Sequence, residues 1–189
     1  MGSDLNIYYI SILFYLVGSL PFAIIVHNLM STSDPRQTGS KNPGATNMYR
    51  VAGPIAGVMT FIGDFLKGFI PIFLLIDFDS TTLYSMSFFI LVGHMFSIFN
   101  KFQGGKGVAT SFGSLLAINL VLGITLMLVW LAVFALKRIS GLAAIISFIL
   151  LPLIVYLVIG SYGFIVISIL HSIIILTNHR NNIKELLQS

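Results

Sequence analysis

The sequence predicts an all-α integral membrane protein with seven transmembrane helices, on the basis of its composition, its apolar runs and the distribution of its charges. The 189-residue chain is 57% hydrophobic and only 8% charged, with a mean hydropathy of +0.99. So little polar surface cannot cover a soluble globule. We see no internal repeat and no separate soluble segment, so residues 1–189 are expected to form a single transmembrane domain.

The first apolar run, residues 5–27, is long enough to cross the roughly 30 Å hydrocarbon core. Pro21 removes a backbone donor, so we expect a kink toward the far end of this helix. The N-terminus lacks the Lys/Arg cluster and the cleavage pattern of a signal peptide, and we expect the run to stay in the mature protein. Residues 53–76 predict a second span, and residues 83–99 predict a third.

The apolar stretch 108–136 can form one long helix, or two short helices with a break near residues 117–119. The stretch 141–177 can likewise be broken near residues 160–163. The distribution of basic residues favours two crossings in each stretch, because cytoplasmic loops carry an excess of Lys and Arg. With both breaks, one side of the membrane receives nine basic residues: Arg36, Lys41, Arg50, Lys101, Lys106, Lys137, Arg138, Arg180 and Lys184.

The same distribution predicts the orientation, with the N-terminus outside and the C-terminus in the cytoplasm. The outer side then receives Asp4, Asp77 and Asp79 and no Lys or Arg. Two helices of about 14 residues each span only about 21 Å. They need a thinned bilayer or a protein lining, and short interrupted segments of this kind tend to border a ligand site. We therefore expect the active face to be cytoplasmic.

The loop of residues 39–50 is the most polar part of the chain, with two glycines, one proline and many small hydrogen-bonding residues. Nested backbone donors beside an Arg fork match a phosphate or another oxyanion. An ordinary connecting loop with turn-forming residues is the alternative interpretation. The candidates are the glycines Gly39 and Gly44, the side-chain donors Ser40, Asn42, Thr46 and Asn47, and the cations Lys41 and Arg50.

A second glycine-rich segment, residues 104–110, opens the fourth apolar run. Gly104, Gly105 and Gly107 allow close backbone approach, and Lys106 adds a charge beside the positive end of a helix. The segment is not a Walker A loop, because Asn100 stands where its first glycine belongs and Gly107 replaces its Ser or Thr. A flexible hinge with Lys106 as a membrane anchor is the alternative. Because this segment and the loop of residues 39–50 are expected on the same face of the membrane, an anion-binding site is favoured over the hinge.

Asp64 and Lys67 lie three residues apart inside the second span, where charges are costly. They can neutralise each other, or Lys67 can add positive field to the site.

His94, His27 and His171 are interpreted as interhelical hydrogen-bonding groups. His179 and Asn182 share one helix face at the depth of the two glycine loops, and a ligand contact is weighed equally with a structural role. The sequence predicts neither a metal nor a thiol, since it has no cysteine and no suitable His/Glu/Asp trio.

These motifs, in this order and over nearly the whole length, resemble the bacterial acyl-phosphate:glycerol-3-phosphate acyltransferases, which are integral membrane enzymes. The resemblance rests on residues 18–22, 39–40, 42–47 and 50, on Asp64, Lys67 and Gly68, on residues 93–94 and 104–110, and on His179, Asn182 and Ile183. It implies a multi-pass enzyme of the bacterial cytoplasmic (inner) membrane, with its active site facing the cytoplasm.

The resemblance implies transfer of an acyl group from acyl phosphate to the 1-hydroxyl of glycerol 3-phosphate, giving lysophosphatidic acid and phosphate at the start of phospholipid synthesis. It implies no metal and no organic cofactor, and contact with the soluble enzyme that makes acyl phosphate. Family positions associated with catalysis correspond to Ser40, Arg50, Lys106, His179 and Asn182.

The chain departs from the family pattern at three places. Lys41 stands where the family has glycine, and Ser97 replaces a common proline. Gly141 and its neighbours replace a Ser-Leu-x-Ser pattern, although Ser140 is adjacent. The first departure adds bulk and charge beside the predicted phosphate loop, and the third puts a serine contact in doubt.

The mechanism that we predict must hold two repelling phosphates together, so cations and oriented N–H groups matter more than bases. We expect one phosphate at residues 40–47 and the other near Lys106, with Arg50 shared or adjacent. The acyl chain should lie between helices. The substrate hydroxyl attacks directly, and its proton passes to a substrate phosphate oxygen or to His179.

Two other functions are consistent with parts of the sequence. Broken helices with Asp64 and Lys67 inside the membrane also suit a transporter of a small organophosphate or anion. The clustering of basic groups at one face favours the enzyme. An acyl-CoA-dependent transferase is disfavoured, because Phe99 and Lys184 stand five residues after His94 and His179, where the His-x4-Asp motif needs Asp.

Overall fold

The computed structural model describes residues 2–75 and 78–188, with side chains from Ile7 onward. Within these ranges the chain forms only helices and connecting loops. Three residues of the predictions above, Ile76 at the end of the second span, Asp77 and the side chain of Asp4, lie outside this part. The helices are α1 (Gly2–Gly18), α2 (Phe22–Met30), α3 (Ala45–Ala52), α4 (Pro54–Phe73), α5 (Ser80–Met95), η1 (Ile98–Asn100), α6 (Val108–Ile118), α7 (Leu120–Lys137), α8 (Ser140–Val158), α9 (Tyr162–Asn178) and α10 (Arg180–Leu187).

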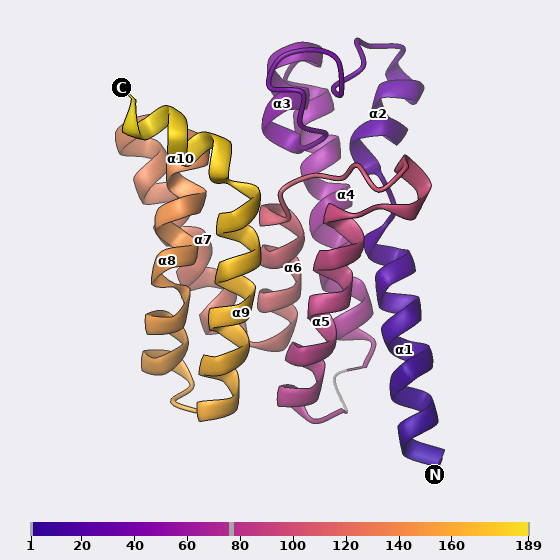
Figure 1. The fold of residues 1–189 in the computed structure, drawn as a ribbon, viewed down its shortest axis with the longest axis vertical. Helices are drawn as coiled ribbons and strands as arrows, with labels where there is room; N and C mark the ends of the chain where they lie inside the picture. The colour runs from indigo at the N-terminus through magenta and orange to yellow at the C-terminus, as the bar shows by residue number, and fades with distance from the viewer. Residues whose placement is uncertain (1, 76–77, 189) are drawn as a thin grey trace.

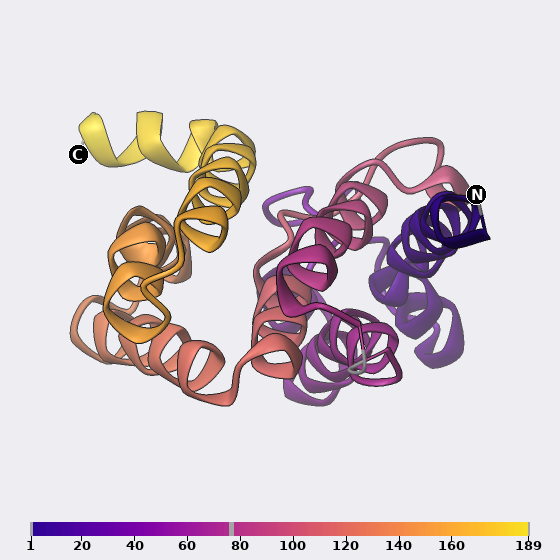
Figure 2. The same cartoon turned by 90° about the horizontal axis from the view of Figure 1, so that it is seen from below.

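The longer helices run along one common axis, and the two ends of the chain lie at opposite ends of the molecule (Figure 1). The α2–α3 loop, helix α3, the α5–α6 loop and α10 all lie at the end that holds the C-terminus. Viewed along the bundle, α7 to α10 form one group and α1 to α5 another, with α6 leading from one to the other (Figure 2). This arrangement gathers the polar loops at a single end.

Five helical segments are long and apolar enough to cross a membrane, or six if the bent pair α9 and α10 counts as one span. The five are Ile7–Met30, Pro54–Phe73, Ser80–Asn100, Leu120–Lys137 and Ser140–Val158. Helix α6 is apolar but has only 11 residues. The prediction of an all-helical membrane protein is thus confirmed, while the number of seven spans stays a prediction.

The first predicted span is interrupted around Pro21, because α1 ends at Gly18 and α2 begins at Phe22, and the two helices together form the candidate span Ile7–Met30. An interruption frees backbone carbonyls that must find other donors inside a membrane. The hydroxyl of Ser97 donates to the carbonyl of Ser19, and Lys67 Nζ donates to the carbonyl of Leu20 at 2.7 Å. The serine that replaces the family's proline therefore satisfies a carbonyl at this break.

The two other predicted breaks are present. Helix α6 ends at Ile118, and Asn119 begins α7 by accepting a hydrogen bond from the Leu122 N–H at 2.9 Å. An Asn side chain is well suited to satisfy a free N–H at a helix start. Gly160 turns the chain between α8 and α9 with a φ of +72°, a backbone conformation that favours glycine.

Glycines bring pairs of helices into backbone contact, as is common in membrane bundles. A Cβ on Gly113 of α6 would lie 2.0 Å from the carbonyl oxygen of Phe65 in α4, and one on Gly68 would lie 2.1 Å from that of Thr110. Gly18 and Gly93 join α1 and α5 in the same way. A continuous apolar core with Leu91, Leu115 and Phe148 then connects α5 to α9 beneath the polar end.

Candidate active site

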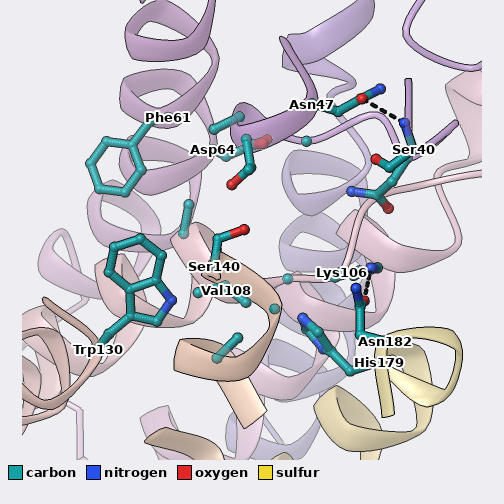
Figure 3. A pocket seen from close by; sticks show the side chains of 18 of the residues that line it. Ser40, Asn47, Phe61, Asp64, Lys106, Val108, Trp130, Ser140, His179 and Asn182 are labelled. Carbon is teal, nitrogen blue, oxygen red and sulfur yellow. Dashed lines mark hydrogen bonds between the residues drawn. The ribbon is translucent and has the colours of Figure 1, made fainter. Parts of the chain in front are cut away.

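A cavity of about 320 Å³ opens between the two helix groups at the polar end of the bundle (Figure 3). Its polar wall comes from the α2–α3 loop, α3, the start of α6, the start of α8 and the start of α10. Its apolar wall comes from α4, α6, α7 and α8. Ten predicted site residues line it: Ser40, Asn42, Gly44, Thr46, Asn47, Arg50, Lys106, Gly107, His179 and Asn182.

Asn47 gives the first loop its shape. Its Oδ1 accepts a hydrogen bond from the Ser40 N–H at 2.9 Å, while its Nδ2 donates to the carbonyls of Pro35 and Thr38 at 2.9 and 3.1 Å. Gly39 has a φ of +62°, and a Cβ there would lie 2.3 Å from Asn47 Oδ1. Asn47 borders the cavity, but both its Oδ1 and its Nδ2 form hydrogen bonds within the loop. These bonds hold Ser40 in a fixed position at the cavity.

The side chains of Ser40 and Arg50 are available to a ligand. Neither makes a side-chain hydrogen bond or ion pair within the described part of the chain, and both are exposed to the cavity. Helix α3 begins at Gly44 without a side-chain cap. Its positive end and the Arg50 guanidinium therefore give this wall an affinity for anions.

A second polar part of the lining is built around Lys106, which precedes the start of α6. Gly107 has a φ of +86°, which turns the chain into the helix, and Lys106 Nζ donates a hydrogen bond to Asn182 Oδ1. Partial burial lowers the pKa of Lys106, as does the charge of Arg50, while the Glu185 carboxylate opposes this shift. The ammonium group is thus only partly compensated and can bind an anion.

His179 lies at the junction of α9 and α10 and is buried. Its Nδ1 lies 2.9 Å from the carbonyl oxygen of Ile175, and a carbonyl can only accept. Nδ1 therefore carries the proton, and the neutral ring keeps a lone pair on Nε2. His179 and Asn182 face the cavity from successive turns, on the side where Lys106 lies (Figure 3).

Lys67 is held away from the cavity. Its ammonium group lies 2.8 Å from Asp64 Oδ1 and bonds to the Leu20 carbonyl, and its side chain is 3% exposed. His94 Nδ1 lies 3.5 Å from Asp64 and 3.1 Å from the Thr110 hydroxyl. Of the two roles weighed for Lys67, the geometry favours charge neutralisation over a contact with substrate.

Four other predicted residues also do not line this cavity: Gly39, Lys41, Gly104 and Gly105. The two glycines of the α5–α6 loop instead pack on α5, because a Cβ on Gly104 would lie 1.8 Å from the His94 carbonyl oxygen and one on Gly105 would lie 2.4 Å from His94 Nε2. Lys41 is exposed and has a φ of +57°, which glycine adopts with less strain.

The cavity also has residues that the sequence analysis did not single out. Glu185 follows His179 and Asn182 at the same three-residue interval, and this spacing could have revealed it. Phe61 and Trp130 form part of the apolar wall, and no sequence signal separates them from lipid-facing aromatics. The Trp130 Nε1 is buried and has no hydrogen-bond partner in the described structure.

The start of α8 places a serine at the cavity. Ser140 is among the residues that line it, although a serine contact with substrate stays a prediction. A Cβ on Gly141 would lie 2.9 Å from Asn182 Nδ2. The glycine thus leaves room for α10 to bring Asn182 close to α8.

The fold and the cavity together define a helical membrane protein with a cavity that is cationic on one side and apolar on the other. Residues 8–189 match the family described as glycerol-3-phosphate acyltransferase, and the chain belongs to this family. It is 40% identical over 176 residues to the glycerol-3-phosphate acyltransferase of Methylococcus capsulatus, covering 92% of this chain and 89% of that protein. It is 41% identical over 181 residues to that of Ruthia magnifica, covering 94% and 91%.

Solved structures of PlsY (YgiH), an integral membrane glycerol 3-phosphate acyltransferase, have a similar fold. Its glycerol 3-phosphate form matches with a TM-score of 0.91 and 36% identity, covering 97% of this chain and 92% of that one. Its lysophosphatidic acid form matches with a TM-score of 0.88 and 35% identity, with the same coverage. The family resemblance that the motifs indicated is thereby confirmed.

Proposed function

We propose that this glycerol-3-phosphate acyltransferase takes the acyl group from acyl phosphate and transfers it to the 1-hydroxyl of glycerol 3-phosphate. The products are lysophosphatidic acid and inorganic phosphate, and the reaction begins phospholipid synthesis. One observation supports the proposal above all others: Ser40, Arg50, Lys106, His179 and Asn182 border one cavity that continues between apolar helices.

The cationic wall suits a reaction between two phosphate-bearing substrates. Two such anions repel each other, and a site that holds them in register lowers the barrier by several kcal/mol. The loop of residues 40–47, Arg50 and Lys106 with its partner Asn182 all contribute to the lining of this cavity. We assign one phosphate to residues 40–47 and the other to Lys106, with Arg50 shared or adjacent.

The apolar wall suits the acyl chain. It is formed by residues of α4, α6, α7 and α8: Phe61, Phe112, Met127, Trp130, Leu131 and Ala144. An acyl chain entering from the bilayer between these helices would place its phosphate end among the cations. This amphiphilic lining explains why a membrane enzyme, rather than a soluble one, handles such a donor.

In the proposed step the 1-hydroxyl oxygen forms a bond to the acyl carbonyl carbon while the bond from that carbon to the phosphate oxygen breaks. The departing phosphate takes the electron pair of the broken bond. The hydroxyl proton goes to a substrate phosphate oxygen, or else to Nε2 of His179, whose lone pair is left free by the bond from Nδ1 to Ile175. Acyl phosphate is already activated, so no acyl-enzyme is required and no metal or organic cofactor is invoked.

We also propose seven spans, with the N-terminus outside and the C-terminus in the cytoplasm of a bacterial inner membrane. Counting α6 and α9 with the five longer segments gives an odd number of crossings, which agrees with termini at opposite ends of the bundle. The loops with Ser40 and Lys106 then face the cytoplasm. There the soluble enzyme that makes acyl phosphate can supply the donor.

A comparison of donors tests this function. The purified protein in lipid nanodiscs is given radiolabelled glycerol 3-phosphate with either palmitoyl phosphate or palmitoyl-CoA, and labelled lysophosphatidic acid is measured. We expect labelled lysophosphatidic acid only in the reaction that contains palmitoyl phosphate. Product only in the reaction that contains palmitoyl-CoA would overturn the choice of donor. Proteoliposomes that take up labelled glycerol 3-phosphate without esterifying it would support a transporter instead.

A further inference from the structure

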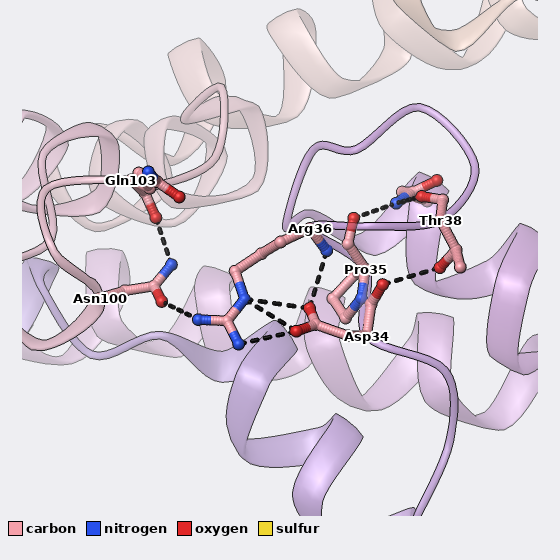
Figure 4. Close-up of polar contacts among 7 residues, drawn as sticks. Asp34, Pro35, Arg36, Thr38, Asn100 and Gln103 are labelled. Atoms are coloured by element: carbon pink, nitrogen blue, oxygen red, sulfur yellow. Dashed lines mark hydrogen bonds and ion pairs between the residues drawn. The ribbon is translucent and has the colours of Figure 1, made fainter.

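Arg36 connects two loops that are far apart in the sequence (Figure 4). Its Nε donates to both carboxylate oxygens of Asp34 at 3.0 and 3.1 Å, and its Nη2 donates to Oδ2 at 2.7 Å. Its Nη1 donates to Asn100 Oδ1 at 2.8 Å. One guanidinium group thus bonds to a carboxylate in its own loop and to the residue that ends η1.

Each end of this contact is rigidly held. Asn100 is 5% exposed, and its Nδ2 donates to the carbonyl of Gln103 in the α5–α6 loop. On the other side, Asn47 binds the carbonyl of Pro35, the residue between Asp34 and Arg36. A path therefore runs from Ser40 through hydrogen bonds to Asn47 and the Pro35 carbonyl, along the chain to Arg36, and through hydrogen bonds to Asn100 and the segment that leads to Lys106.

The positive charge of Arg36 is already paired with the carboxylate of Asp34. Hydrogen bonds from Arg36 lower the pKa of Asp34 to about 2, so Asp34 is ionised and paired with Arg36 at neutral pH. Arg36 also does not line the cavity that holds Ser40 and Lys106. These two facts argue against a direct contact between its guanidinium and a substrate phosphate.

We propose that the contact between Arg36 and Asn100, oriented by Asp34, is a positioning clasp that sets the spacing between the Ser40 loop and the Lys106 loop. The proposal rests on the function proposed above, in which these loops hold two phosphates at once. A displacement of about 1 Å between reacting groups can reduce turnover about 100-fold. Arg36 and Asn100 are thus positioning residues.

Arg36→Lys and Asn100→Ala test the clasp in complementary ways. Lysine keeps the charge but loses the planar fork that binds two partners at once. We expect both variants to retain a folded bundle while kcat/KM for glycerol 3-phosphate falls about 10- to 100-fold. Gln37→Ala is the matched control, since Gln37 is exposed in the same loop and its side chain makes no hydrogen bond in the described structure.

A cross-link separates positioning from a merely structural role. The chain has no cysteine, so Arg36→Cys with Asn100→Cys introduces the only two thiols. A bifunctional methanethiosulfonate about as long as an arginine side chain should join them and restore at least half of the lost turnover. Reduction should reverse the gain, and neither single-cysteine variant should respond to the reagent.

The outcomes separate the clasp from the function on which it rests. Absence of acyl transfer by the unmodified protein would overturn the proposed function. If the unmodified protein is active, three results would each overturn the clasp alone: full activity of Arg36→Lys, an equal loss in Gln37→Ala, or a completed cross-link that leaves turnover low.

Discussion

At the scale of single residues, the site depends on which polar groups are already occupied and which are free. Asn47 uses its whole amide inside the loop, and Lys67 is bound to Asp64 and to a carbonyl. Ser40 and Arg50 keep their side chains free, and Lys106 is held by a neutral amide. Binding of an anion is therefore expected from these three residues rather than from every polar group near the cavity.

Lys106→Ala should reduce kcat/KM about 100-fold or more, because removing a group that stabilises developing charge costs that much in comparable sites. The fold should persist, since the side chain is only partly buried and its one bond is to Asn182. Lys184→Ala removes an exposed cation from α10 and should change kcat/KM less than 3-fold. Near-normal turnover of Lys106→Ala would contradict the role of this lysine.

The dependence of kcat/KM on pH should reflect the charged groups next to Lys106. Burial lowers its pKa and the Glu185 carboxylate raises it, so binding should be lost as the pH rises through this lowered pKa. Glu185→Gln removes the carboxylate and should move the alkaline limb of the kcat/KM profile to lower pH. An unchanged limb would show that Lys106 does not control it.

At the scale of elements, short helices and glycine contacts bring α8 and α10 together. Helix α10 bends by 65° from α9, which turns Asn182 and Glu185 toward the cavity. None of its described residues is buried, so its position depends on a few contacts with its neighbours. Gly141 is one of these contacts.

Gly141→Ala should displace Asn182 from Lys106, because the added Cβ would come within 2.9 Å of Asn182 Nδ2. We expect a 5- to 10-fold loss of kcat/KM, of the order seen for small misplacements, with little change in melting temperature. Gly163→Ala is the control, since its Cβ would meet nothing closer than 3.2 Å. Equal losses in the two variants would point to a general effect on the helices.

At the scale of the whole molecule, the odd number of crossings that we propose puts the two termini on opposite sides of the membrane, and the proposed orientation puts the site on the cytoplasmic side. The cysteine-free chain allows this to be measured directly. Single cysteines at Tyr162, the first residue of α9, and at Lys184, on α10, should react from opposite sides. An impermeant maleimide should label Tyr162→Cys in intact cells and Lys184→Cys in inverted vesicles. Labelling of both from one side would overturn the proposed topology.

Much of this architecture followed from local patterns in the sequence. Breaks were expected near residues 117–119 and 160–163 and are present at Asn119 and Gly160, since a cap and a left-handed turn are properties of a few neighbouring residues. A kink was expected at Pro21, and the chain is interrupted there between Gly18 and Phe22 within the span Ile7–Met30. What the sequence did not show is that Ser97 and Lys67, from distant segments, satisfy the carbonyls freed at this break.

The sequence by itself determined that the chain is a helical membrane protein and which family it resembles. It also determined which polar segments are candidates for the site. Hydropathy and the order of motifs can be read from neighbouring residues without any knowledge of contacts between distant ones. Only the tertiary structure decided that Lys67 is neutralised, that Asn47 shapes a loop, and that Ser140 and Glu185 border the cavity. The physical reason is that a polar side chain in a dry interior acts through its nearest partners, and those partners come from helices remote in the sequence.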